Sequence, residues 1–124
     1  LRPRWTVEKE KLKSKFSGFN FYATSNKITS VAGYLYTNYD NSYYVKITIP
    51  ESYPYELPKV SLPNVILESN CPHCYKNDNI CVMKSDQWSS TLSIAFLVSK
   101  VAVWLNKYDY WKRNGIWPGN QQEH

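Results

Sequence analysis

The stretch YYVKITIPESYPYELPKV, residues 43–60, contains both the clearest strand of the chain and the bend that ends it. Apolar side chains occupy every second position from Tyr43 to Ile49, which is the period of a strand with one buried face. A proline then follows at every fourth position from Pro50 to Pro58, and prolines at this density exclude a long helix. The stretch therefore predicts a strand, a fixed bend and at most a short strand after it.

Two more strands and a helix are expected on the amino-terminal side. Residues 19–26 and 27–38 read as strands that short polar turns join to each other and to the strand beginning at Tyr43. Strands connected in this way form an antiparallel meander with one face on the core. Residues 6–16 place their apolar side chains on one side of a short helix, with Thr6 or a neighbour as its cap.

The best helix of the chain lies on the carboxy-terminal side, in residues 90–111. Its apolar residues recur at helical spacing, and Ser89, Ser90 or Thr91 is expected to cap its start. The order helix, four strands, bend, polar loop and long helix predicts one α+β domain over residues 1–124, with the helices packed on one face of the meander.

The chain carries a net charge of +5 at pH 7, and much of the positive charge lies near its beginning. This charge predicts either a solvated helix face or a docking surface for an acidic partner, with the candidate residues Arg4, Lys9, Lys11 and Lys13. Direct nucleic-acid binding is not expected, because no basic residues interleave with the later aromatics in a recognisable motif. A membrane span is not expected, because no apolar run approaches about 18 residues.

Cysteine usage indicates a reducing compartment. The chain has three cysteines, an odd number, and its first residues, LRPRWTVEKEK, lack the apolar segment of a secretory signal. We therefore expect a cytoplasmic protein in which a disulfide is not favoured. No cofactor is expected.

All three cysteines lie in one polar loop, SNCPHCYKNDNICVM, residues 69–83, which allows three chemistries. Cys71 and Cys74 have the C-x-x-C spacing of a thiol–disulfide oxidoreductase, but the YKNDN that follows is a poor start for the helix that such a site needs. Zinc binding is the second possibility, with Cys71, His73, Cys74 and Cys81 as ligands. The first three of these lie within four residues, which is crowded for a zinc site. The third possibility is a single nucleophilic cysteine, Cys81.

The surroundings of Cys81 resemble the catalytic core of the ubiquitin-conjugating enzymes, which have the UBC fold. IPESYPYELPKV, residues 49–60, is similar to the family's strand end and its Y-P-x-x-P-P-K-V loop. NICVMKSDQWSSTLSI, residues 79–94, is similar to its I-C-L segment, W-S-P and following helix. The family's His-Pro-Asn motif starts ten residues before the catalytic cysteine, where this chain has C-P-H at residues 71–73. On this resemblance the C-P-H-C pattern is a coincidence of letters, and Cys81 is the cysteine that acts.

The resemblance implies that Cys81 accepts the C-terminal carboxyl of a ubiquitin-like modifier as a thioester from an activating enzyme, and passes it to an amine acceptor. It implies that His73, in place of the family's Asn, donates to the oxyanion, transfers a proton or only braces the loop. Pro72, Asp78 and Trp88 would support the loop around the cysteine. The family meets its activating enzyme through the first helix, which would account for the basic residues there.

Several departures separate the chain from the family pattern. Cys71 replaces the family's His, Asp78 a Gly and Val82 a Leu. An aromatic-rich tail over about residues 109–124 is expected in place of the usual C-terminal helices. This tail, with its pattern W-x-x-x-G-x-W-P-G, is similar to that of bacterial relatives encoded in antiphage CBASS operons. There the conjugated protein is a cGAS-like nucleotidyltransferase, which implies antiviral defence. Two other classes stay open: a C-P-H-C oxidoreductase and a non-catalytic UBC-like binding module.

Overall fold

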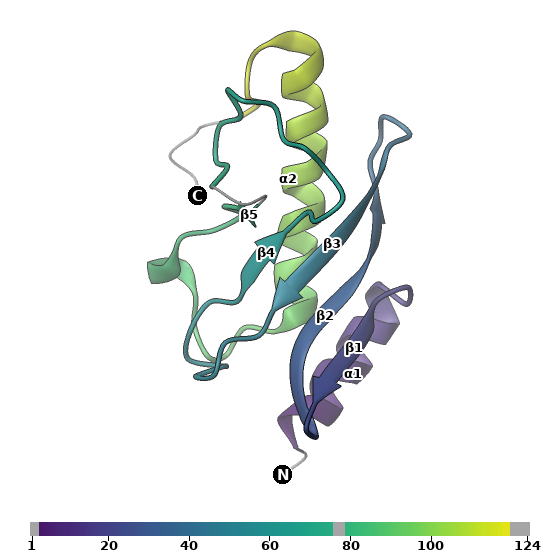
Figure 1. The fold of residues 1–124 in the computed structure, drawn as a ribbon, viewed down its shortest axis with the longest axis vertical. Helices are drawn as coiled ribbons and strands as arrows, with labels where there is room; N and C mark the ends of the chain where they lie inside the picture. Colours follow the sequence, from purple (N-terminus) through teal and green to yellow (C-terminus); the bar gives the residue numbers. More distant parts are fainter. Residues whose placement is uncertain (1–2, 76–78, 120–124) are drawn as a thin grey trace.

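The computed structural model of the chain describes residues 3–75 and 79–119. Figure 1 shows its elements, which in chain order are α1 (Arg4–Lys15), β1 (Asn20–Thr24), β2 (Lys27–Tyr36), β3 (Ser42–Thr48), β4 (Lys59–Ser61), β5 (Asn79–Ile80), the short 3-10 helix η1 (Ser85–Gln87) and α2 (Ile94–Asn114). Among the described residues, no helix has the length and apolarity needed to cross a membrane.

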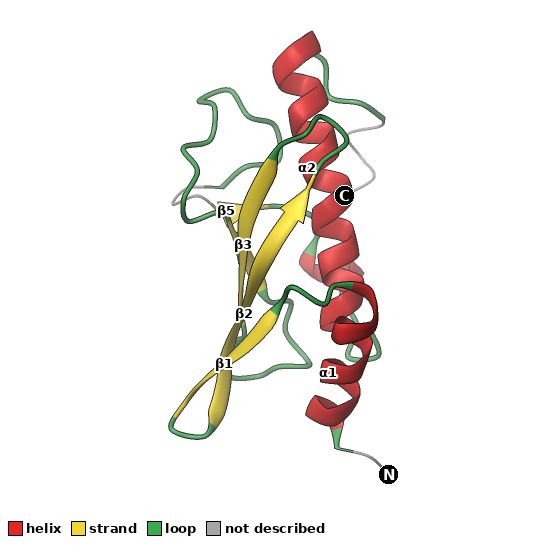
Figure 2. Ribbon diagram, turned by 90° about the vertical axis from the view of Figure 1, so that its right-hand side faces the viewer, coloured by secondary structure: helices red, strands yellow, loops and turns green. Residues whose placement is uncertain are grey.

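The five strands form one antiparallel sheet in chain order, from β1 to β5. Figure 2 shows α1 and α2 lying together on one face of this sheet. The predicted α+β arrangement, a meander with helices on one face, is therefore confirmed. The sheet has one strand more than the sequence predicts, because β5 spans two residues and is too short to show a period of two.

The core lies between the inner face of the sheet and α2. Strand β3 contributes the alternating residues Tyr43, Val45 and Ile47, each exposed by 5% or less. Helix α2 contributes the residues expected from its periodicity, which are Ile94, Leu97, Val98, Val101, Leu105 and Tyr108. Burying one aliphatic side chain of this size contributes roughly 1.5–3 kcal/mol, so this interface supplies much of what holds the sheet and α2 together.

Helix α1 begins at Arg4, ahead of the predicted cap Thr6. The carbonyl of Pro3 accepts hydrogen bonds from the backbone N–H groups of Thr6 and Val7, so Thr6 already lies inside the first turn. The prediction that Thr6 caps the helix is therefore wrong. The buried residues of α1 are Leu12, as expected from the apolar pattern, and Glu8, which that pattern does not predict.

The buried carboxylate of Glu8 ties α1 to the start of α2. Its Oε1 accepts the backbone N–H of Ile94 at 2.9 Å, and its Oε2 accepts from Nε of Arg4 at 3.0 Å and from the hydroxyl of Tyr53. The guanidinium of Arg4 also donates to the carbonyls of Ser90 and Leu92, at 2.7 and 2.6 Å. This network fixes the segment that leads into α2.

Helix α2 begins later than predicted, at Ile94. Ser93 is its cap, and the Ser93 side chain accepts a backbone N–H of the first turn at 3.1 Å. The caps predicted at residues 89–91 are wrong, because the carbonyl of Ser89 accepts the N–H of Leu92 at 2.9 Å and closes a separate turn before the helix.

The end of the described chain folds back onto α2. Gly115 ends the helix with a φ of 74°, a left-handed conformation that glycine adopts without a Cβ clash. Trp117 then packs against Trp104 of α2, with ring centroids 5.4 Å apart, and is only 4% exposed. The segment predicted as a tail is thus helical as far as Asn114, and its Trp117 belongs to the core.

Candidate active site

Cys81 is fixed at the end of a short hairpin. The backbone N–H of Tyr75 donates to the carbonyl of Asn79 at 2.7 Å, Cys74 forms a bridge with Ile80, and the N–H of Cys81 donates to the carbonyl of His73 at 2.9 Å. On its other side β5 pairs with β4. The backbone next to Cys81 is therefore hydrogen-bonded on two sides, to the segment 73–75 and to β4.

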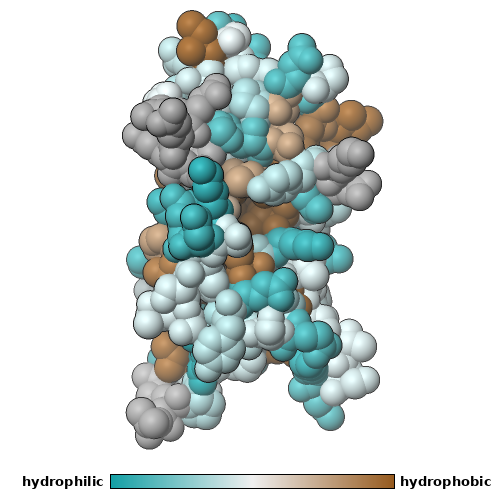
Figure 3. Space-filling view, turned by 90° about the vertical axis from the view of Figure 1, so that its left-hand side faces the viewer, coloured by the Kyte–Doolittle hydropathy of each residue, from teal (hydrophilic) through white to brown (hydrophobic). Residues whose placement is uncertain are grey.

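The thiol of Cys81 is free and half-buried. It donates a hydrogen bond to the carbonyl of Met83 at 3.7 Å, a distance suited to the large sulfur atom. The side chain opens into a cavity of about 330 Å³ whose walls include Lys59, Tyr75 and Ser85. Figure 3 views the molecule from the side on which β5 and η1 lie in Figure 1, and apolar surface shows in a hollow between hydrophilic side chains.

Tyr75 is a site residue that the sequence analysis misses. Its ring is 60% exposed and lines the cavity beside Cys81. The pKa of Tyr75 is raised above its ordinary value, first by a hydrogen bond with the side chain of Cys81 and then by desolvation. A phenol held in its protonated form is a hydrogen-bond donor toward the sulfur.

His73 lies next to Cys81 through its backbone. Its φ of 60° is in the left-handed region, which turns the chain out of the hairpin at this residue. The imidazole makes an edge-on contact with the ring of Trp117, at a centroid distance of 5.2 Å. The structure thus places the carbonyl of His73 on Cys81 and its ring under the carboxy-terminal segment, and a chemical role for the ring stays a prediction.

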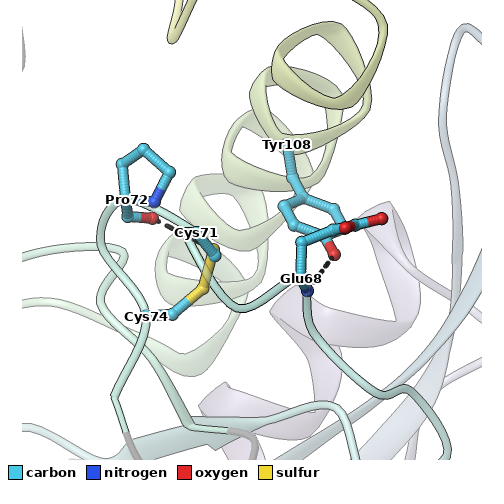
Figure 4. Close-up of a disulfide and its surroundings, with 5 residues drawn as sticks. All are labelled: Glu68, Cys71, Pro72, Cys74 and Tyr108. Carbon is cyan, nitrogen blue, oxygen red and sulfur yellow. Dashed lines mark hydrogen bonds between the residues drawn. A yellow bond between two sulfur atoms is a disulfide. The ribbon is translucent and has the colours of Figure 1, made fainter. Parts of the chain in front are cut away.

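Cys71 and Cys74 form a disulfide, which Figure 4 shows. The expectation that no disulfide is favoured is therefore wrong, whereas the interpretation that C-P-H-C has no redox function stays a prediction. The turn at Pro72 and His73 brings the two Cα atoms to 5.7 Å, within the range that a disulfide requires. The number of cysteines bears only on the expected redox compartment, whereas this local turn brings the two cysteines close enough to form a bond.

The disulfide loop is anchored to α2. Figure 4 shows the hydroxyl of Tyr108 accepting the backbone N–H of Glu68, at 3.0 Å, just before the loop. The N–H of Cys71 in turn donates to the carbonyl of Glu68 at 3.0 Å. Tyr108 is buried in the core, so this contact sets the position of the chain that leads to Pro72 and the hairpin.

The zinc hypothesis does not fit this arrangement. The sulfurs of Cys71 and Cys74 are bonded to each other, and the ring of His73 contacts Trp117. Within residues 3–75 and 79–119, no group of three or more His, Cys, Asp or Glu side chains is arranged to hold a metal ion. The four candidate ligands therefore do not converge on one point.

Of the residues expected to support the loop, Trp88 packs between Cys81's segment and the proline-rich bend. Trp88 is 8% exposed, its indole N–H donates to the carbonyl of Pro54 at 2.8 Å, and its ring lies 6.2 Å from that of Tyr53. Pro72 is half-buried beside the disulfide. Asp78 lies outside the described residues.

The basic residues of α1 divide into two groups. Lys9, Lys11 and Lys13 are exposed, whereas Arg4 is engaged inside the molecule by Glu8 and the turn before α2. A groove of about 450 Å³ separates α1 from α2, and Lys11 lies on its wall. Residues two apart on a helix point to different sides, so Lys9 and Lys13 share one exposed face of α1 while Lys11 faces the groove.

Known proteins are similar to this chain in sequence and in fold. A family model described as type II CBASS E2 protein matches residues 8–124. Ubiquitin-conjugating enzyme 15 of Arabidopsis thaliana is 32% identical over 85 residues, which are 63% of this chain and 50% of the plant protein. The chain thus aligns with about half the length of this curated relative.

Two solved structures of ubiquitin-conjugating enzymes have the same fold. The enzyme E2 from Plasmodium falciparum superimposes with a TM-score of 0.63 at 23% identity, covering 83% of this chain and 96% of that one. UbcA1 from Agrocybe aegerita gives a TM-score of 0.59 at 19% identity, covering 95% of each chain. With the meander, the single free cysteine after β5 and the matched family model, the chain belongs to the type II CBASS E2 proteins, which are ubiquitin-conjugating-enzyme-like.

Proposed function

We propose that this protein is an acyl carrier in which Cys81 accepts the C-terminal carboxyl of a partner protein as a thioester and transfers it to an amine. The observation that carries the proposal is the free, half-buried thiol that lines a cavity and whose backbone N–H is hydrogen-bonded to the carbonyl of His73. Thiol is suited to this work, because it is strongly nucleophilic near neutral pH and its thioester keeps enough energy for aminolysis.

The reaction has two steps. The sulfur of Cys81 attacks the thioester carbonyl of an activated carboxyl group, and the thiol of the activating enzyme leaves. An acceptor amine then attacks the new carbonyl carbon, the C–S bond breaks with its electron pair going to sulfur, and the amine proton is lost to solvent or a nearby base. Donors aimed at the oxyanion speed both steps, and His73 is the residue that the sequence assigns to this role.

The partners follow from the same proposal. An activating enzyme would meet the exposed face of α1 that carries Lys9 and Lys13, four residues apart, since neighbouring charges of one sign attract an acidic surface. The acyl donor would be a ubiquitin-like modifier or the C-terminus of a cGAS-like nucleotidyltransferase, within antiviral defence in a bacterial cytoplasm. The acceptor would be a protein amine.

The test is the intact mass of the protein after co-expression with its genomic neighbours. We expect a protein-sized adduct that thiol reductant removes and that is absent from Cys81→Ala. The double variant Cys71→Ser/Cys74→Ser is the matched control, because it removes the disulfide without creating a free thiol and leaves Cys81 in place. An adduct of unchanged abundance in Cys81→Ala would contradict the proposal.

A second candidate, a thiol–disulfide oxidoreductase, is favoured by one observation, the bonded pair Cys71 and Cys74. In that function the disulfide accepts two electrons and two protons from a dithiol partner and becomes two thiols. Catalysed reduction of insulin by dithiothreitol tests it, with a Cys71→Ser/Cys74→Ser variant as the comparison. Equal rates for the two proteins would remove this candidate. The third class, a non-catalytic binding module, predicts no covalent adduct in either experiment.

A further inference from the structure

The pairing of the hairpin places Tyr75 and Cys81 on one face. Tyr75 is opposite Asn79, Cys74 is opposite Ile80 and His73 is opposite Cys81. Side chains on a strand alternate between faces, so those of Tyr75 and Cys81 emerge on the same side as diagonal neighbours. A diagonal pair is within reach of a long aromatic side chain.

The hydrogen bonds around the sulfur leave it open as an acceptor. The thiol proton is directed to the carbonyl of Met83, 3.7 Å away, and Tyr75 and Cys81 line the same cavity. The raised pKa of Tyr75 agrees with a phenol that keeps its proton next to sulfur. Among the described residues that line the shared cavity, Lys59 supplies the formal charge, which is positive.

The imidazole of His73 is not placed by this geometry to donate a hydrogen bond to the sulfur of Cys81. Its left-handed backbone ends the alternation, and its ring contacts Trp117, which is buried. The pairing places both Asn79 and Tyr75 on the face of Cys81, and Tyr75 is the one of these two with a hydroxyl donor.

We infer that the hydroxyl of Tyr75 is a catalytic hydrogen-bond donor to the sulfur of Cys81. It stabilises the negative charge on sulfur before attack on the carbonyl, and again when the C–S bond breaks and the electron pair returns to sulfur. The role in breaking the C–S bond rests on the proposed function. The role in stabilising the charged sulfur before attack concerns the free protein alone. Lys59 contributes a longer-range positive field in the same cavity.

The test that needs no partner is the pH dependence of alkylation of Cys81 by iodoacetamide. The rate is followed by peptide mass without reductant, so that the Cys81 peptide is read separately from the Cys71–Cys74 peptide. In Tyr75→Phe we expect the pH of half-maximal rate to rise by about one unit, which is about tenfold slower alkylation near neutral pH, because a donor to a charged sulfur is lost. Tyr36→Phe is the matched control, since Tyr36 is 76% exposed on β2.

The second arm measures acyl transfer with a small probe, a peptide α-thioester of mercaptoethanesulfonate. Cys81 takes the acyl group by thiol exchange, and free lysine then takes it from Cys81. We expect Tyr75→Phe to slow loading about tenfold near neutral pH and to approach the wild-type rate at high pH. A Tyr75→Ala variant with the same pH shift as Tyr75→Phe assigns the effect to the hydroxyl.

The outcomes separate the two ideas. An unchanged alkylation profile in Tyr75→Phe overturns the inference, whether or not the wild-type protein loads. A loss that appears only in Tyr75→Ala also overturns it, because the ring would then be a wall of the cavity. If the profile shifts but the wild-type protein never carries a protein-sized adduct, the contact with sulfur stands and the proposed function falls.

Discussion

Replacing Glu8 with Ala tests how helix α1 is held to the start of helix α2. Glu8 is 2% exposed and accepts hydrogen bonds from the N–H of Ile94, from Arg4 and from Tyr53. Ile94 is fully buried, so its N–H would be left with neither carboxylate nor water, which costs about 1–3 kcal/mol. The side chain of Arg4 is 33% exposed, so water replaces part of that ion pair and its loss adds about 1 kcal/mol or less.

Together these losses predict that Glu8→Ala lowers the free energy of unfolding by about 1–4 kcal/mol. Urea denaturation followed by circular dichroism measures this value. Glu10→Ala is the matched control, because Glu10 is an exposed residue of the same helix, and we expect a change within about 0.5 kcal/mol. A loss below about 0.5 kcal/mol in Glu8→Ala would refute the role given to the buried carboxylate.

Two other substitutions test the core near the site. Burial raises the pKa of Asp109, but the hydrogen bonds that its carboxylate accepts from Thr37, Tyr43 and Asn41 outweigh this effect. The pKa of Asp109 is therefore lowered in the folded state. A lowered folded pKa means that this stabilisation is present above the ordinary value of about 3.9 and is lost as the pH falls through the folded pKa. Acid titration of unfolding should therefore show a steeper decline below about pH 4 in the wild type than in Asp109→Asn. Trp117→Ala removes a ring packed on the aromatic residues beneath it and should cost about 3 kcal/mol in urea, whereas the exposed neighbour Ile116→Ala should change little.

The elements with a strong period were predictable from the sequence. The alternation around Tyr43 to Ile47 and the helical spacing from Ile94 to Tyr108 are both long enough to reveal a buried face, and both lie in the core. The position of the candidate nucleophile, Cys81, came from a resemblance of several motifs in order rather than from any single one.

The remaining features depend on contacts between distant segments. Glu8 reads as a polar residue on a solvated face, and it is buried only because the backbone of Ile94 supplies a donor from another helix. The start of α2 is displaced because Arg4 holds the carbonyls of the preceding turn. Tyr75 becomes a site residue only through the register of the hairpin, which the polar loop sequence does not indicate.

The disulfide shows a different limit. An odd number of cysteines bears only on the expected redox environment, and on that basis no bond between Cys71 and Cys74 is expected. The bond forms in the structure because His73 turns the backbone through a left-handed conformation and the loop is anchored by Tyr108. Local backbone geometry, rather than composition, places the two sulfurs together.

The most direct test of the central claim, that Cys81 carries an acyl group, is a trapping experiment with Cys81→Ser. A serine oxygen forms an ester that thiol reductant does not cleave, so the account predicts a protein-sized adduct on residue 81 that survives reductant, identified by peptide mass. In the wild type the same adduct should be present without reductant and absent with it. An adduct mapped to Cys71, Cys74 or a lysine in both proteins, with residue 81 unmodified, would contradict the account.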